Sequence, residues 1–558
     1  IFAGHSAQLV TALPAAKANS LLIAAFDAAR PAAQIEHLVA PGAAVHSLDA
    51  LRLPDEMLSD RTHYLASLNF ATNFVFFRDA GGHHTRLATA NYWGAYGAGA
   101  VRLWCRLYDG AGNVLAAWEE KAGPANSALI LDSKDLRARF DLPEFTGQLF
   151  IHAVGIQGHD VVKYALDTYG DTPEVLSCTH DANSWPADFY AGLPAPAEGE
   201  DVVLWLQNSQ PFAIPAGEIA LNIMGRNDAV ALPEPLAPFA TRRLSVSELL
   251  PEARWPRQVE VASGKYVVRP RYEAFAKSGR RRIAHVNVER TDLKPDPKLA
   301  GLRSVMGKGH ILPAPVLPLG RFDSLILPTP MARGIGHFPL KATVYDASGE
   351  AVAEHRFGNL PRDHASLLDV SALLAERRKS LPSGYGHAEI AYDFDAGREA
   401  DGWIHALFRY RDRISGHAAE SSFGSHMFNS VLVYKNEPQS YSGRPPGLTT
   451  RLFLRIGQKP YGTLCHLIYP ASTPWHAKSD TALILTSNKG EEIARAHAAI
   501  PCGGSYRWHV SETFDATALE AAGGGAYVII RDTTCRLFGY HGLISGEAAF
   551  SLDHMFGF

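Results

Sequence analysis

A β-hairpin pattern that ends near a histidine or an asparagine recurs along this chain, and it constrains the fold more than any other feature. Its clearest copy is WIHALFRYRDRISGHAAESSFGSHMFN, residues 403–429. This copy begins as an alternating aromatic strand, turns at Ser415-Gly416 and returns through small and polar residues to His426. Looser copies cover residues 74–93, 163–183 and 536–556, and a related pair of strands surrounds His285. A repeated segment of this kind predicts a chain of repeated β modules.

The turn signals that precede each hairpin also come in a fixed order. A strand first enters a turn that combines Asp or Asn with Gly, as at Asp109 and Asp346. The glycine supplies the positive φ that a tight hairpin requires. A capped turn follows further along, as at Asp132, Ser245 and Asp369. Such turn signals, about ten residues apart between short β-rich runs, predict β-sandwiches.

The predicted fold class is therefore all-β. The ordered pattern resembles tandem immunoglobulin-like or fibronectin-like β-sandwich modules, as seen in many bacterial binding and assembly proteins, and this resemblance concerns the architecture alone. Helical periodicity is confined to two short segments, 371–378 and 516–522. Pro- and Gly-rich joints divide the chain into five predicted modules: 1–96, 97–191, 200–292, 293–436 (an extended Pro-rich connector plus the fourth sandwich) and 447–558.

Composition excludes several classes of function. A formal charge of −4 argues against a nucleic-acid partner, because phosphate binding needs an excess of Lys and Arg. No apolar run approaches the roughly 20 residues of a membrane span. Five cysteines without CxxC spacing favour reduced thiols over a zinc ribbon or a disulfide framework. We expect a cytoplasmic location, with secretion left open because the chain starts at Ile1 and not at Met.

Histidines at matching places form the first candidate site. His180, His285, His426 and His554 each lie near the end of a closing hairpin, and Asn91 takes that place in the first module. Neutral imidazole is a common ligand of Zn, Fe, Cu and Ni, so these histidines predict a transition-metal site if the modules fold back on one another. Modules in an end-to-end row would keep them apart. Each would then be a junction residue that donates its ring N–H to a backbone carbonyl.

A polar strand face in the fourth module is the second candidate. Alternate residues of a strand share a face, which groups the predicted ligand-binding residues Trp403, His405, Arg409, Arg411 and Arg413. With His417 and Glu420 nearby, this face predicts an anion clamp, since a guanidinium group matches carboxylate or phosphate. The alternative is a solvated face whose arginines pair with acids such as Asp393 and Asp395.

Two further kinds of site are weighed on residue type. Five tryptophans could form stacking platforms for sugars or an apolar ligand, although tryptophans in sandwiches are usually core residues; they are Trp185, Trp205, Trp403, Trp475 and Trp508. The segments SSFGSH and SLDH place serines and Asp553 beside His426 and His554. They lack the GxSxG motif of a nucleophile elbow.

These patterns favour a multi-module β-sandwich protein that binds or assembles with an unknown small molecule, glycan or protein. The first alternative is a metal-dependent enzyme whose His-rich site comes from several modules. The second is a carbohydrate-directed protein that uses exposed aromatic residues. No catalytic residue is assigned, and whether the chain is an enzyme is left open.

Overall fold

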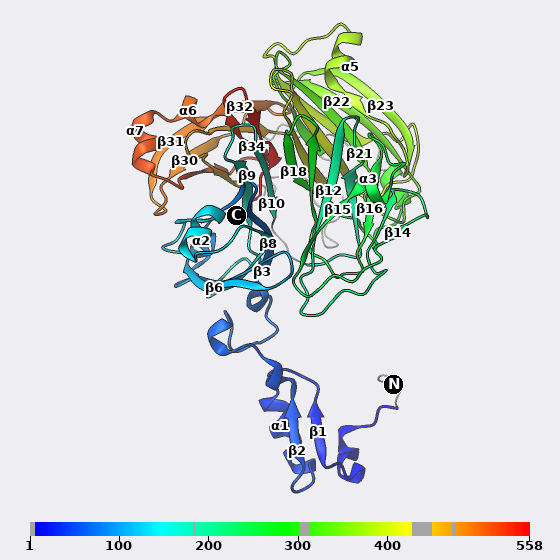
Figure 1. Ribbon diagram of the computed structural model, residues 1–558, viewed down its shortest axis with the longest axis vertical. Helices are drawn as coiled ribbons and strands as arrows, with labels where there is room; N and C mark the ends of the chain where they lie inside the picture. The colour runs from blue at the N-terminus through cyan, green and yellow to red at the C-terminus, as the bar shows by residue number, and fades with distance from the viewer. Residues whose placement is uncertain (1–5, 182–184, 302–311, 427–448, 471–475, 558) are drawn as a thin grey trace.

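The computed structural model of the chain describes residues 6–181, 185–301, 312–426, 449–470 and 476–557. It is mostly β, and its strands form many antiparallel sheets (Figure 1). The predicted all-β class is therefore confirmed, whereas the immunoglobulin-like or fibronectin-like detail of the modules stays a prediction. Among the helices of the described residues, none is long and apolar enough to cross a bilayer.

Four units with one common plan make up the described part of the chain after residue 71. When strands are numbered within a unit, strands 1, 6, 3 and 4 pair in that order, and strands 5, 2, 7 and 8 pair in that order. One or two short helices join strand 5 to strand 6. Strands 7 and 8 form the closing hairpin, and a buried apolar core fills each unit.

The units contain the following elements in chain order. The first has β3 (Thr72–Ala80), β4 (His83–Ala90), η6 (Tyr92–Tyr96), β5 (Arg102–Tyr108), β6 (Val114–Lys121), β7 (Ala128–Asp132), α2 (Ser133–Arg139), β8 (Phe145–Val154), β9 (Tyr164–Gly170) and β10 (Leu176–Asp181). The second has β11 (Phe189–Pro194), β12 (Glu200–Gln207), β13 (Ala220–Ile223), β14 (Val230–Ala231), β15 (Thr241–Ser245), α3 (Val246–Leu249), β16 (Gln258–Ala262), β17 (Arg271–Ala276), β18 (Arg281–His285) and an added β19 (Asn287–Val288).

After α4 (Pro297–Gly301), the third unit has β20 (Leu312–Val316), β21 (Phe322–Thr329), β22 (His337–Asp346), β23 (Ala351–Pro361), β24 (Leu368–Asp369), α5 (Val370–Glu376), β25 (Gly386–Tyr392), β26 (Trp403–Asp412) and β27 (Ala418–His426). The fourth has β28 (Thr450–Arg455), β29 (Gly462–Ile468), β30 (Thr481–Thr486), β31 (Glu492–Ala498), β32 (Ser505–His509), α6 (Val510–Thr513), α7 (Ala516–Ala522), β33 (Tyr527–Asp532), β34 (Phe538–Ser545), β35 (Ala549–Phe550) and β36 (Asp553–His554).

Local sequence explains these elements. In β26 the alternate residues Ile404, Ala406, Phe408 and Tyr410 belong to the core of the third unit, as period-two alternation requires. The predicted cap Asp369 accepts a hydrogen bond from the backbone N–H of Ala372 and starts α5. Proline places β20, with the sequence LPAPV, at the edge of its sheet, because proline cannot donate to two neighbouring strands.

The first unit runs across the predicted boundary between residues 96 and 97. β4 pairs with β7 and β9, and β3 pairs with β8, so the eight-stranded sheet of this unit contains strands from both sides of that boundary. The predicted hairpin of residues 74–93 thus supplies strands 1 and 2 of a unit and is not a closing hairpin. Asn91 caps η6 by accepting a hydrogen bond from the N–H of Gly94 and does not lie at the place of the histidines.

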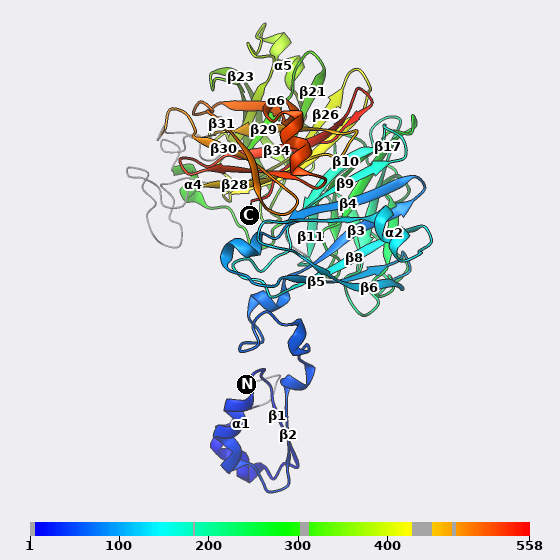
Figure 2. The same cartoon turned by 90° about the vertical axis from the view of Figure 1, so that its left-hand side faces the viewer.

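Residues before the first unit form an arm that projects away from the rest of the molecule (Figures 1 and 2). A parallel pair of short strands, β1 and β2, lies in this arm. In order, its elements are η1 (Val10–Ala16), β1 (Ser20–Ile23), α1 (Ala29–Ile35), η2 (Glu36–Leu38), β2 (Ala44–Ser47), η3 (Leu48–Leu51) and η4 (Asp55–Met57), with η5 (Ser67–Phe70) at the start of the first unit.

The four units close into a ring, with the first unit in blue to cyan, the second in green, the third in lime to yellow and the fourth in orange to red (Figure 1). Buried polar pairs join neighbouring units. Arg271 donates to Asp181 between the second and first units at 3.0 Å, and Arg455 donates to Asp167 between the fourth and first units at 2.7 Å. The third and fourth units share one apolar core cluster.

Candidate metal centre

The closing hairpins of the four units meet at the centre of the ring. β10 packs beside β18, β18 beside β27, β27 beside β36 and β36 beside β10. Each of these strands is the returning part of a closing hairpin or directly follows it. The sequence positions at which the histidines recur are therefore neighbours in space, although they come from different units.

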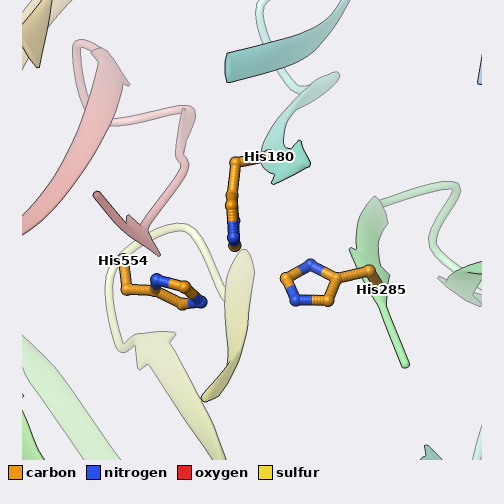
Figure 3. Close-up of side chains that lie close together, drawn as sticks. All are labelled: His180, His285 and His554. Atoms are coloured by element: carbon orange, nitrogen blue, oxygen red, sulfur yellow. The ribbon is translucent and has the colours of Figure 1, made fainter. Parts of the chain in front are cut away.

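Three of the four predicted histidines lie together at this centre (Figure 3). One ring nitrogen from each of His180, His285 and His554 lies within 4.8 Å of the other two. The ring centroid of His180 is 4.8 Å from that of His285 and 4.0 Å from that of His554. The backbone of His426 pairs with Trp403 at the end of β27, and its side chain lies outside the described part of the chain.

His180 is oriented by a buried carboxylate from another unit. Its Nδ1 lies 2.8 Å from Oδ2 of Asp553, and the two side chains are 6% and 1% exposed. The other carboxylate oxygen of Asp553 accepts a hydrogen bond from the hydroxyl group of Ser421 in the third unit, at 2.8 Å. Burial would raise the pKa of Asp553, but the neighbouring imidazoles and the Ser421 hydroxyl hold it below its usual value. The carboxylate is therefore charged at neutral pH.

The ring of His285 lies buried without a hydrogen-bond partner. It is 1% exposed, and neither of its ring nitrogens has a hydrogen-bond partner. Burial, followed by His180 and the nearby guanidinium of Arg269, holds its pKa well below the usual value. A buried polar group without a partner costs about 1–3 kcal/mol. The neutral imidazole of His285 therefore presents an unused lone pair.

His554 completes the cluster from the fourth unit. Burial and the neighbouring His180 lower its pKa to about 3, so this imidazole is also neutral at physiological pH. The ring of Phe423 packs 4.3 Å from it, centroid to centroid. His554 also lines a cavity of about 390 Å³ whose walls include Phe423, Phe538 and Tyr540. This residue therefore connects the cluster to a space large enough for a small molecule.

The donor set fits a transition-metal ion. Neutral imidazole nitrogens suit Zn, Cu, Fe and Ni, and a carboxylate behind one imidazole is the usual second contact of a metal-bound histidine. Three protein ligands leave a coordination position for water or substrate, as in catalytic zinc sites, whereas structural zinc sites are closed by four. The cluster thus has the ligand type that a metal ion would require, with one nitrogen from each ring within 4.8 Å of the other two.

Comparisons with known proteins leave the family open. No protein-family model and no curated protein matches the chain. Among solved structures, it is similar to the viral chemokine binding protein R17 of rodent gammaherpesvirus Peru, with 8% identity over 68% of this chain and 88% of that one, at a TM-score of 0.17. Dimeric latent PorU from Porphyromonas gingivalis matches with 8% identity over 81% of this chain and 40% of that one, at a TM-score of 0.14.

Escherichia coli alpha-2-macroglobulin activated by porcine elastase matches with 10% identity over 87% of this chain and 44% of that one, at a TM-score of 0.10. All three TM-scores are below 0.5, so no feature of these proteins is transferred to this chain.

The predicted anion-binding face of the fourth module lies against the second unit. Arg409 is 7% exposed; its Nε donates to Glu420, and its guanidinium carbon lies 3.6 Å from the ring centre of Trp255. Glu420 also accepts from the hydroxyl group of Tyr272 at 2.6 Å and pairs with Arg282 at 2.9 Å. Arg409 and Glu420 therefore satisfy each other at a contact between units, and a ligand role for them stays a prediction.

The two histidines of this face are also buried within the protein. His405 is 1% exposed, and its Nε2 lies 2.5 Å from the amide nitrogen of Asn287 and 3.2 Å from the hydroxyl group of Ser422. His417 is fully buried, and burial lowers its pKa to about 4. Burial likewise lowers the pKa of His405 to about 3. Both imidazoles are therefore neutral in the folded protein.

The outer arginines of the strand meet an acid that the sequence did not indicate. The side chains of Arg411 and Arg413 are 60% and 41% exposed, and each pairs with Asp323 on the neighbouring strand at 2.6 Å. Asp323 faces Arg411 across the β21–β26 ladder. The expected partners Asp393 and Asp395 instead lie near Arg356. The end of the face that carries Arg411 and Arg413 is therefore exposed to solvent.

The five tryptophans considered as stacking platforms are in different surroundings. Trp185 is 66% exposed, Trp508 is 1% exposed in the core of the fourth unit, and Trp205 packs against Phe76 at 5.2 Å. Trp403 lies under the guanidinium of Arg290 at 5.0 Å, and Trp475 lies outside the described residues. A carbohydrate site built on them stays a prediction.

Sequence reasoning named Asp553 and Ser421 only as members of local hydrolytic motifs and did not assign Phe423. A signal for Asp553 was present, because it directly precedes His554 and alternation turns the two side chains to different sides of the strand. No local pattern could show that the carboxylate of Asp553 would meet His180, which is 373 residues away in the sequence.

Proposed function

We propose that this protein is a metalloprotein that binds one transition-metal ion at the centre of its four-unit ring, through His180, His285 and His554. The observation that carries the proposal is the meeting of three imidazole nitrogens, within 4.8 Å of one another, from three different units. Tandem β-sandwiches have no structural need to bring these three side chains together.

The contacts of the histidines favour a metal over simple junction residues. A junction histidine would donate its ring N–H to a backbone carbonyl, but both ring nitrogens of His285 are without such a partner. His180 instead bonds to a buried carboxylate, the usual arrangement behind a metal-bound imidazole. A metal ion would give each lone pair a partner and would offset the cost of burying His285.

The same contacts favour a catalytic metal over a structural one. Among the described residues three imidazoles meet, a ligand number that would leave a coordination position free, and His554 borders the cavity of about 390 Å³. When bound there, the metal would supply Lewis-acid chemistry or activate a water molecule. The function proposed is therefore metal-dependent catalysis on a small molecule that enters this cavity.

The test is to purify the full chain without a poly-histidine tag or chelator and to measure its metals by elemental analysis. We expect close to one equivalent of a transition metal per chain, or uptake of one equivalent of added Zn²⁺. His285→Ala should lower the affinity for Zn²⁺ by at least about 100-fold, because it removes one of the three imidazoles that meet among the described residues.

His466→Ala is the matched control, since His466 is also a fully buried histidine but lies outside the cluster. This variant should keep the metal. A metal-free wild-type protein that also fails to take up Zn²⁺, Cu²⁺ or Fe²⁺ would refute the proposal. So would a His285→Ala protein that binds Zn²⁺ as tightly as the wild type.

The two other interpretations of the sequence stay predictions. A binding or assembly role would need a ligand surface, and three of the residues predicted for it, His405, Arg409 and Glu420, are in contact with the second unit. A carbohydrate-directed role rests on exposed aromatic residues, of which Trp185 is one.

A further inference from the structure

We propose that Asp553 is the positioning residue of this metal centre: it presents His180 as an Nε2 ligand and supplies the negative charge that balances the ion. This inference rests on the proposed metal function and adds a role that the ligand set alone does not show. It also brings the third unit into the centre, through Ser421.

The first observation is that both carboxylate oxygens of Asp553 have fixed partners. Oδ2 lies 2.8 Å from Nδ1 of His180, and Oδ1 accepts from the hydroxyl group of Ser421 and from the backbone N–H of His554, both at 2.8 Å. Asp553 itself is 1% exposed. One carboxylate therefore holds a ligand from the first unit and the backbone of a ligand from the fourth.

The second observation concerns the tautomer of His180. The other oxygen of Asp553 already accepts two hydrogen bonds, so the carboxylate acts as an acceptor and Nδ1 of His180 is placed to donate its proton to Oδ2. The lone pair of this imidazole is then on Nε2, the nitrogen that can face the other two rings. Figure 3 shows the His180 ring between His285 and His554.

The third observation is the charge of the site. Within 4 Å, the ion-pair partner of Asp553 among the described residues is His180, and neither a lysine nor an arginine takes that place. A buried carboxylate is costly unless a cation or several hydrogen bonds compensate it. A divalent ion held by three neutral imidazoles would provide that cation, because Asp553 is hydrogen-bonded to one of these imidazoles. The carboxylate would in turn strengthen the metal–imidazole bond.

The decisive experiment compares Zn²⁺ binding of the full-length wild type and Asp553→Asn by competition with a chromophoric chelator. Asparagine keeps the size of the side chain but removes its charge. We expect the affinity to fall by about 10- to 100-fold, the usual effect of removing such a contact. Ser421→Ala should weaken binding less, because the carboxylate and its bond to His180 remain.

Asp532→Asn is the matched control, since Asp532 is equally buried in the fourth unit and accepts bonds from Thr481 and Thr534. This variant should bind Zn²⁺ like the wild type even if it is less stable. Unfolding of each metal-free variant separates a loss of stability from a loss of affinity. If Asp553→Asn binds Zn²⁺ normally, the positioning role is overturned while the metal centre stands.

A spectroscopic measurement keeps the inference testable if Asp553→Asn does not fold. Nitrogen chemical shifts of histidine-labelled, metal-free wild type should show His180 protonated at Nδ1. Protonation at Nε2 would overturn the inference without reference to metal uptake. A wild type that binds no metal at all would instead refute the proposed function, and this inference with it.

Discussion

Replacing Glu420 by glutamine should destabilise the protein strongly, because its carboxylate is the buried counter-charge of two arginines. Glu420 pairs with Arg282 at 2.9 Å and accepts from Arg409 and from the hydroxyl group of Tyr272. Burial alone would raise its pKa, but the two guanidinium groups lower it to about 2 from an ordinary value of 4.5. At 1.36 kcal/mol for each pKa unit, this fall corresponds to about 3 kcal/mol.

That magnitude agrees with the roughly 3–5 kcal/mol lost when one partner of a buried ion pair is removed. The assay is urea unfolding of the wild type and Glu420→Gln at pH 7, followed through tryptophan fluorescence. The contribution of Glu420 to the free energy of unfolding also depends on pH. Because the pKa of Glu420 is lower in the folded state than in the unfolded state, this contribution is complete above pH 4.5. It is lost as the pH falls from 4.5 towards 2, and the variant should lack this loss.

Glu354→Gln is the control, since Glu354 forms an exposed pair with Lys341 in the same unit. It should cost less than about 1 kcal/mol. A Glu420→Gln protein with the stability of Glu354→Gln would refute the reasoning. It would show that the contact between the second and third units opens readily, as a ligand-binding role for Arg409 and Glu420 would need.

Two further predictions concern the same strand. Phe408→Ala should cost about 3–5 kcal/mol as a core truncation, whereas Arg411→Ala should cost well under about 1 kcal/mol because its pair with Asp323 is largely exposed; chemical unfolding of both variants checks the order of the two effects. Burial, followed by Arg269, lowers the pKa of His405 to about 3, so the stability that depends on its neutral form is complete above pH 6.5 and is lost as the pH falls towards 3. His405→Gln should therefore flatten the decline of stability between pH 6.5 and 5 by about 2 kcal/mol, and parallel pH profiles of variant and wild type would contradict this.

Much of the secondary structure could be predicted from the sequence, because it depends on contacts between near neighbours. Alternation placed Phe408 in the core, the side chain of Asp369 capped a helix, and the predicted helix at 516–522 is α7. The hairpin of residues 74–93 shows the limit of such patterns. A strand–turn–strand signal is the same at the start and at the end of a unit, and only its pairing with β8 and β9 distinguishes the two.

The recurrence of His180, His285 and His554 at matching places was also visible in the sequence, since repeated units place equivalent residues at equivalent positions. The sequence did not show whether these three histidines meet in space. Tandem sandwiches can run in a row or close into a ring, and the choice depends on contacts between residues far apart in the chain, such as Arg455 with Asp167. Each such contact must overcome the entropy of closing a long loop and the desolvation of its charges, which no local pattern reports. Local sequence determined the strands and the histidine positions, and the tertiary structure alone decided that the histidines share one centre.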